Sequence, residues 1–275
     1  MTARPRPLRA LLVLAFIATV VGCTDGATPE TAPPEPPTPS GGLVVVFVDL
    51  TGGLDAGPDS ARVSAIAEDV RQLMLSAVPR TEIQVYPVDN SPTVAPVVTW
   101  TVPDIPSRSS ELVTTRAGVL QEANDARRRV LALYQTVYSK RTDAPLTCLL
   151  RSLEKAGSIF ARAVDDAPRR LVFLSDMVEE CDGPAGPIFM TQERFRTEAL
   201  EAYAPEFSPT LFDGVELDVV PSRQGAGTQS KAIPAEDLRA AWVILFRAAG
   251  FDESTARSAW DYDGLDVSAS PWLPQ

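Results

Sequence analysis

A short series of oxygen-bearing side chains follows an unbroken apolar segment of the chain. Residues 43–48 are Leu-Val-Val-Val-Phe-Val, and Asp49, Thr51 and Gly53 come directly after them at alternate positions. A carboxylate and a hydroxyl two residues apart are oxygen ligands of the kind that suits a divalent cation such as Mg²⁺. Asp49 could equally begin a turn or cap the next helix, so both interpretations stay open on this segment alone.

Two later segments add similar chemistry. Asp176 ends a second apolar run, 171–174, and Thr147 stands where a helix would begin. Short Val-rich runs bounded by turn signals are typical of strands buried on both faces of a parallel sheet. Because ligands of open α/β sheets bind beyond the carboxyl ends of the strands, we expect Asp49, Thr147 and Asp176 at one edge. The loop after Asp176 could add an oxygen ligand or form a solvated acidic surface, through Glu179, Glu180 and Asp182.

Apolar periodicity predicts the elements that position these side chains. Strands are expected at short apolar or alternating runs, at 43–48, 81–88, 97–102, 171–176 and 215–220. Helices are expected where apolar residues recur every three to four positions, at 63–78, 108–140, 147–164 and 235–249. The segment 97–102 lies between prolines, which favours an edge strand. We predict an α/β fold over residues 42–250, Rossmann-like with three layers, in which helices cover both faces of a mostly parallel sheet.

The last 25 residues show no clear pattern of either kind. We expect residues 251–275 to form an irregular tail that packs over the domain through Trp260, Tyr262 and Trp272.

The amino-terminal segment predicts export. Arg4 to Arg9 form a basic start, and the apolar run 11–21 is far shorter than the roughly 20 residues that cross a bilayer. This combination is typical of a secretory signal, which we place at residues 1–22.

Val20-Val21-Gly22-Cys23 resembles the lipobox of bacterial lipoproteins, although that family usually has Leu in place of Val20. The resemblance implies that Cys23 becomes the first mature residue and carries a diacylglyceryl group and acyl chains such as palmitate. Several acyl chains anchor a protein stably to a membrane, here the bacterial cell envelope on its extracytoplasmic side. Ordinary signal cleavage would instead leave Cys23 incidental. Residues 23–41, rich in proline, would form an extended tether.

Composition excludes several kinds of function. The formal charge of −11 disfavours nucleic acid and anionic lipid headgroups as partners. The chain contains no histidine. A Ser-His or Cys-His nucleophile pair and a His-ligated zinc site within this chain are therefore excluded.

In order and spacing, the three polar segments resemble the von Willebrand factor type A domain and its metal-ion-dependent adhesion site. That family's first loop is Asp-x-Ser-x-Ser, so Asp49 and Thr51 match two ligand positions and Gly53 replaces the third. Thr147 and Asp176 match the second and third loops. The resemblance implies a Mg²⁺ ion with one coordination position left for an acidic group of a protein partner. The missing hydroxyl at Gly53 can be replaced by water, which weakens the site.

The same resemblance places Cys148 and Cys181 near each other. Both follow ligand positions at the same edge, and two thiols in an exported protein should pair if their Cα atoms lie within about 7 Å. A disulfide there would join the second and third loops. Two separately buried free thiols are the alternative.

The leading hypothesis is a non-enzymatic, membrane-anchored module that recognises a protein partner, with or without metal. An Asp-x-Thr-Gly loop also resembles the nucleophile loop of haloacid-dehalogenase-type phosphatases, in which Asp49 would be phosphorylated. Against this, Thr51 stands where those enzymes commonly have a second acid, and no lysine is clearly placed for their third motif. The third hypothesis is a scaffolding lipoprotein with a vestigial site, whose long helix at 108–140 makes the contact.

Overall fold

In the computed structural model the chain forms two units, residues 1–38 and 39–275, and the helices and strands given below belong to the second unit. The described residues are 41–50, 61–89, 95–136, 147–163, 167–179, 181–183, 186–187, 207–220, 235–261, 267 and 270–273. The predicted signal, the tether and Cys23 lie outside them, as do Thr51, Gly53, Glu180 and Tyr262. Within the described ranges, no helix has both the length and the apolar content that crossing a bilayer requires.

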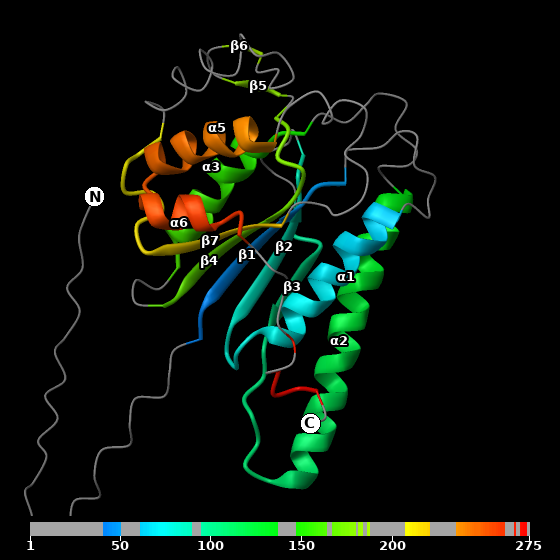
Figure 1. Ribbon diagram of the computed structural model, residues 1–275. Helices are drawn as coiled ribbons and strands as arrows, with labels where there is room; N and C mark the ends of the chain where they lie inside the picture. Colours follow the sequence, from blue (N-terminus) through cyan, green and yellow to red (C-terminus); the bar gives the residue numbers. More distant parts are fainter. Residues whose placement is uncertain are drawn as a thin grey trace, which may run out of the picture. The chain divides into compact units, whose positions relative to one another are not determined.

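A five-stranded sheet forms the central layer (Figure 1). Its strands are β1 (Leu43–Val48), β2 (Glu82–Pro87), β3 (Val98–Thr101), β4 (Arg169–Leu174) and β7 (Val215–Val220), in the order β3-β2-β1-β4-β7. The strands β1, β2, β4 and β7 pair in parallel, and β3 pairs antiparallel with β2 at the edge. This is the order of a doubly wound α/β sheet with an antiparallel edge strand, so the predicted fold class is confirmed.

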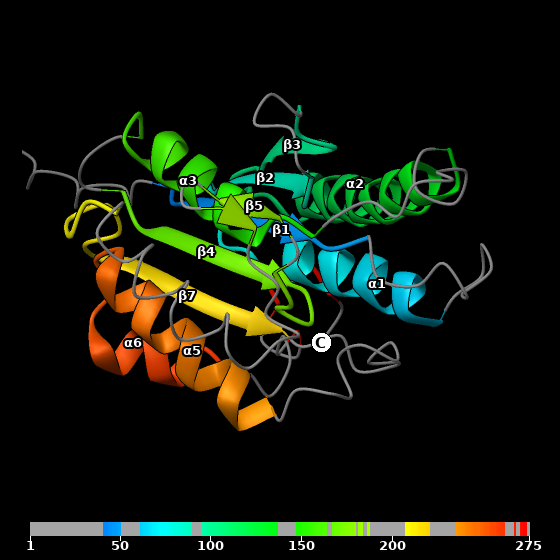
Figure 2. The same ribbon diagram turned by 90° about the horizontal axis from the view of Figure 1, so that it is seen from above.

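Helices cover both faces of the sheet (Figure 2). On one face lie α1 (Ala61–Ser76) and α2 (Ser109–Thr136), and on the other α3 (Leu149–Phe160), α5 (Ala235–Ala248) and α6 (Glu253–Ser258). A short antiparallel pair, β5 (Asp182–Gly183) with β6 (Gly186–Pro187), follows β4. Helix α2 corresponds to the helix predicted at 108–140, of which residues 137–140 lie outside the described residues.

The strand β1 is buried on both faces because its side chains alternate between two cores. Val45 and Phe47 belong to the core under α3, α5 and α6, whereas Val46 and Val48 belong to the core under α1 and α2. Phe47 stacks on Phe173 of β4 with ring centres 5.6 Å apart. Burying a large apolar side chain contributes roughly 1.5–3 kcal/mol, so both cores fix β1 in the middle of the sheet.

The tail was predicted to be irregular, but its residues 253–258 form helix α6. A helix of six residues is too short to show an apolar period. Asp252 begins it, and its carboxylate accepts a hydrogen bond from the Thr255 backbone N–H at 2.9 Å. Hydrogen bonds from Ser254 and Thr255 hold the pKa of Asp252 well below its usual range. Trp272 is fully buried and packs in the core under α1 and α2.

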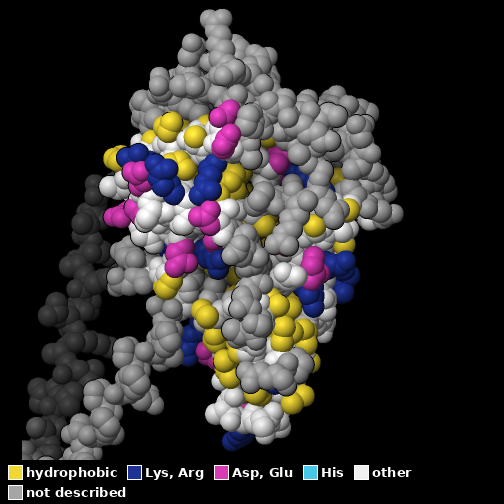
Figure 3. Space-filling view, in the orientation of Figure 1, with side chains coloured by type: hydrophobic (Ala, Val, Ile, Leu, Met, Phe, Trp, Pro, Cys, Tyr) yellow, Lys and Arg dark blue, Asp and Glu magenta, His cyan; other side chains and the backbone are white. Residues whose placement is uncertain are grey.

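Acidic and basic side chains are mixed over α5 and α6 (Figure 3). Glu253 pairs there with Arg257 at 2.7 Å and with Arg247 at 3.5 Å. Exposed pairs of this kind contribute little stability. Because both signs of charge are mixed there, the surface over α5 and α6 does not have a uniformly positive or negative electrostatic potential.

Candidate functional site

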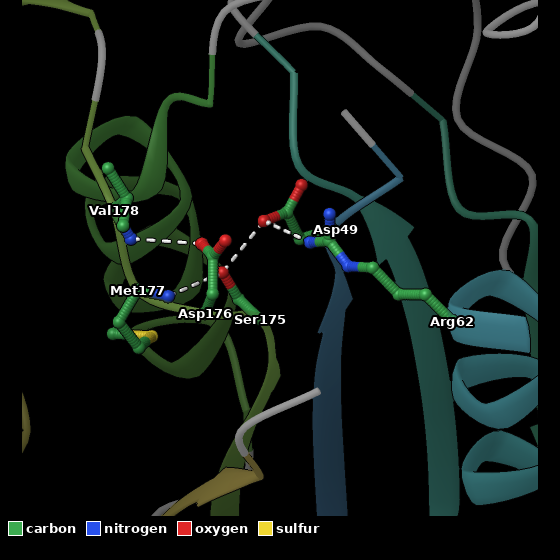
Figure 4. A network of polar contacts seen from close by, with 6 residues as sticks. All are labelled: Asp49, Arg62, Ser175, Asp176, Met177 and Val178. Carbon is green, nitrogen blue, oxygen red and sulfur yellow. Dashed lines mark hydrogen bonds and ion pairs between the residues drawn. The ribbon is translucent and has the colours of Figure 1, made fainter. Parts of the chain in front are cut away.

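The register of β1 and β4 brings Asp49 and Ser175 together. Val48 lies opposite Leu174 in the parallel pair, so the next residue of each strand becomes a neighbour of the other. The backbone N–H of Asp49 donates to the carbonyl of Leu174 at 3.0 Å. The hydroxyl of Ser175 donates to Asp49 Oδ2 at 2.9 Å, which joins two positions 126 residues apart (Figure 4).

Arg62 reaches the same carboxylate from the first turn of α1 (Figure 4). Its Nη2 donates to Asp49 Oδ2 at 3.1 Å, and the two side chains are 7% and 1% exposed. The pair is therefore a buried ion pair, not a surface contact. In such a pair, removing one partner is strongly destabilising, by about 3–5 kcal/mol, because the other charge stays buried without its counter-ion.

The loop after β4 is fixed by its own polar contacts. Ser175 Oγ accepts a hydrogen bond from the Met177 backbone N–H at 2.9 Å, and Asp176 Oδ1 accepts one from the Val178 N–H at 3.2 Å (Figure 4). Met177 has a φ of +62°, a backbone conformation that costs energy for a residue other than glycine. The indole N–H of Trp242, on α5, donates to the Met177 carbonyl at 2.7 Å. Contacts from both sides thus hold the strained loop in one shape.

Glu179 is the residue that fastens this loop to α3. It is fully buried, with Oε2 accepting from the Leu150 N–H at 2.8 Å and Oε1 accepting from the Cys181 N–H at 2.9 Å. The N-cap of α3 is Cys148, whose side chain makes no capping hydrogen bond. Glu179 supplies that capping oxygen from a distant part of the chain, with a negative charge that suits the positive end of the helix dipole.

These contacts correct two sequence-based expectations. Thr147 is not the N-cap of α3, because the helix begins one residue later than predicted; Thr147 itself is buried. Glu179 does not lie on a solvated acidic surface, since the N-terminus of α3 and its own loop enclose it. The side chain of Asp182 lies outside the described residues.

A disulfide joins Cys148 to Cys181 with Cα atoms 5.1 Å apart, so the start of α3 and the loop after β4 are also linked covalently. The two sulfur atoms and a Glu179 carboxylate oxygen lie within 4.8 Å of one another, a grouping of metal-ligand type. Metal binding by cysteine requires thiolates. While the disulfide is intact, these sulfur atoms therefore serve as a covalent link and not as ligands.

The contacts of Asp49 test whether the edge fits the metal site that the resemblance implies. Mg²⁺ binds oxygen at about 2.1 Å, so an ion on Asp49 Oδ2 would lie roughly 5 Å from the Arg62 guanidinium. At an effective dielectric constant of about 20, the repulsion between these charges is on the order of 6 kcal/mol. The chain also has Gly53 at the third ligand position. The residues present therefore do not fit a divalent cation at Asp49.

A second group of interacting side chains, Tyr86, Asp89 and Lys155, lies at the carboxyl end of β2. The ammonium group of Lys155, on α3, lies 4.2 Å from the centre of the Tyr86 ring. Burial lowers the pKa of Lys155, and the nearby Asp89 acts in the opposite direction. Burial also raises the pKa of Tyr86. This part of the edge thus combines a cation, an aromatic ring and a partly exposed carboxylate.

Two residues of this edge, Ser175 and Arg62, were not predicted from the sequence, although each has a signal there. Ser175 follows the second apolar run as Asp49 follows the first, so aligning the ends of the two strands pairs them. Arg62 lies four residues before the buried Ile66, on the same helical face. Glu179 was expected as a possible oxygen ligand or as part of a solvated acidic surface. Its capping role has no signal in the sequence, because its partner at the start of α3 is distant along the chain.

Comparisons with known proteins add little to this geometry. No family model matches the chain, and no curated protein matches it. Among solved structures, it is similar to the conserved hypothetical protein BatB of Bacteroides thetaiotaomicron, at 12% identity and a TM-score of 0.34, over 65% of each chain. It is also similar to a von Willebrand factor type A protein of Catenulispora acidiphila, at 14% identity and a TM-score of 0.38, over 75% of this chain and 43% of that one.

A third similar structure is an aerotolerance-related membrane protein of Bacteroides fragilis NCTC 9343 with multiple mutations to serines. Its identity is 12% and its TM-score 0.36, over 80% of this chain and 94% of that one. At these TM-scores the likeness carries no argument about the site. The fold class rests on the sheet order and the two helical layers of the chain itself.

Proposed function

We propose that this protein is a non-enzymatic binding module, held on the extracytoplasmic side of a bacterial membrane through lipidated Cys23 and the proline-rich tether. Its partner is a protein, and the binding surface is the carboxyl edge of the sheet, which includes the described residues that follow β1, β2 and β4. This edge is where ligands of open α/β sheets bind.

One observation carries the proposal: the polar groups at this edge hold loops together. Asp49 is 1% exposed and accepts hydrogen bonds from Arg62 and Ser175, while Glu179 is buried against backbone N–H groups. A phosphorylated aspartate needs an accessible carboxylate that can attack a phosphoryl group. Polar groups that already make structural contacts of this kind help to form a rigid surface for another protein. They are poorly placed to act as a nucleophile.

Site-specific photo-cross-linking tests the proposal and its location. A photoreactive amino acid is placed at Asp89 on the carboxyl edge, at Asp213 near the amino end of β7, or at Arg129 on the exposed side of α2. The anchored full chain is cross-linked in its native membrane, and bound proteins are identified. The proposal predicts a specific protein partner from Asp89 and none from Asp213.

The other outcomes count against the proposal. Cross-links from Arg129 without any from Asp89 would favour the scaffolding hypothesis, in which α2 makes the contact. Cross-links from neither position would contradict partner binding at both surfaces. Phosphatase activity of the full chain with Mg²⁺ that Asp49→Asn abolishes would favour the enzyme hypothesis instead.

A further inference from the structure

The edge of the sheet contains a cation of its own. Arg62 places its guanidinium 3.1 Å from Asp49 Oδ2, the carboxylate that matches the first ligand of a metal-ion-dependent adhesion site. We infer that the Arg62 guanidinium takes the place of the divalent cation, so this edge is assembled without metal. The inference goes beyond the proposed function, because it concerns the edge with or without a partner.

The first support is that Asp49 already has the contacts a metal would provide. A cation at an adhesion-type site neutralises the first-loop aspartate and links it to the loop after the fourth strand. Arg62 neutralises Asp49 here, and the Ser175 hydroxyl makes the link to that loop at 2.9 Å. Charge neutralisation and loop joining are therefore both supplied by side chains (Figure 4).

The second support is that two features of the sequence both disfavour metal binding at this edge. Gly53 lacks the hydroxyl of the third ligand position, which weakens metal binding, and Arg62 adds a fixed positive charge that repels a metal ion. A guanidinium is always charged, and that of Arg62 comes from a helix packed against the core. Asp49 is therefore neutralised without an ion from solution. A partner then binds to preformed loop surfaces and not through an open coordination position.

Thermal unfolding of the full chain in detergent micelles tests the inference, with Mn²⁺, Mg²⁺ or EDTA present. The Tm of the wild-type protein is expected to be the same in all three. Arg62→Ala is expected to unfold at lower temperature and to regain part of the loss when Mn²⁺ is added, since Asp49 is then without its counter-ion. The double variant Asp49→Asn/Arg62→Ala should not respond to Mn²⁺. Arg71→Ala, another arginine of α1, is the matched control and should not respond either.

Two results would overturn the inference. One is a wild-type Tm that rises with Mn²⁺ and returns with EDTA, which needs no variant and stands even if Arg62→Ala fails to fold. The other is an Arg62→Ala variant that folds but does not respond to Mn²⁺, which would mean that Arg62 does not stand in the place of a cation. Neither result depends on finding a partner, so this inference and the proposed function can fail separately.

Discussion

Replacing Glu179 by alanine should destabilise the domain more than any exposed substitution on α3. Glu179→Ala removes the acceptor of two hydrogen bonds, from the Leu150 and Cys181 backbone N–H groups, at 2.8 and 2.9 Å. Each buried N–H left without a partner costs about 1–3 kcal/mol, and the loss of a charge at the start of α3 adds less than about 2 kcal/mol. Because removing a buried carboxylate also relieves its desolvation, we expect a net loss of about 3 kcal/mol.

Urea unfolding of the oxidised protein, followed by circular dichroism, measures this loss. In a domain of this size, about 3 kcal/mol corresponds to a fall in Tm of roughly 10 °C. Glu179→Gln keeps one acceptor oxygen and should lose about half as much. Glu154→Ala, an exposed residue of the same helix, is the control and should stay within about 0.5 kcal/mol of wild type. A Glu179→Ala variant as stable as Glu154→Ala would refute the capping role.

Three further predictions concern stability. Replacing Cys148 and Cys181 by serine opens a link of sequence separation 33 and should cost about 4 kcal/mol in urea unfolding; reducing the wild-type disulfide should give the same loss, and no loss from either would contradict the link. Trp242→Phe leaves a buried loop carbonyl without its donor and should cost about 1–3 kcal/mol, whereas Trp260→Phe should be nearly neutral because its indole N–H has no acceptor among the described residues; equal losses would argue against the Trp242 hydrogen bond. Asp252 has a folded-state pKa below its ordinary value of 3.8, so its stabilisation of α6 is complete above about pH 5 and decreases as the pH falls through 3.8 toward the folded-state value. Hydrogen exchange in α6, compared with Asp252→Ala, should therefore differ at neutral pH and converge as the solution is acidified; a difference that grows in acid would contradict the assignment.

The sheet could be predicted because its strands depend on local patterns. The runs 43–48 and 171–174 are apolar on both faces, and 97–102 lies between prolines, so the two central strands and the edge strand follow from composition and spacing. Helix α6 was missed because its six residues show no apolar period.

The contacts of the site could be predicted only in part. Placing the polar residues at one edge follows from topology, but the charged partner of Asp49 depends on how α1 packs. The predicted helix began at residue 63, so Arg62 lay outside it, whereas in the structure Arg62 lies in the first turn of α1 and is buried against Asp49. Glu179 likewise resembles a surface acid in the sequence, and only its contacts with the start of α3 give it a buried, capping role.

A crystal structure of the protein grown with Mn²⁺ tests most directly whether Arg62 or a metal neutralises Asp49. The account predicts a guanidinium on Asp49 Oδ2, a Ser175 hydroxyl on the same oxygen, and no anomalous scattering from manganese at this edge. An anomalous peak beside Asp49, with Thr147 or Asp176 among the ligands and Arg62 displaced, would contradict it.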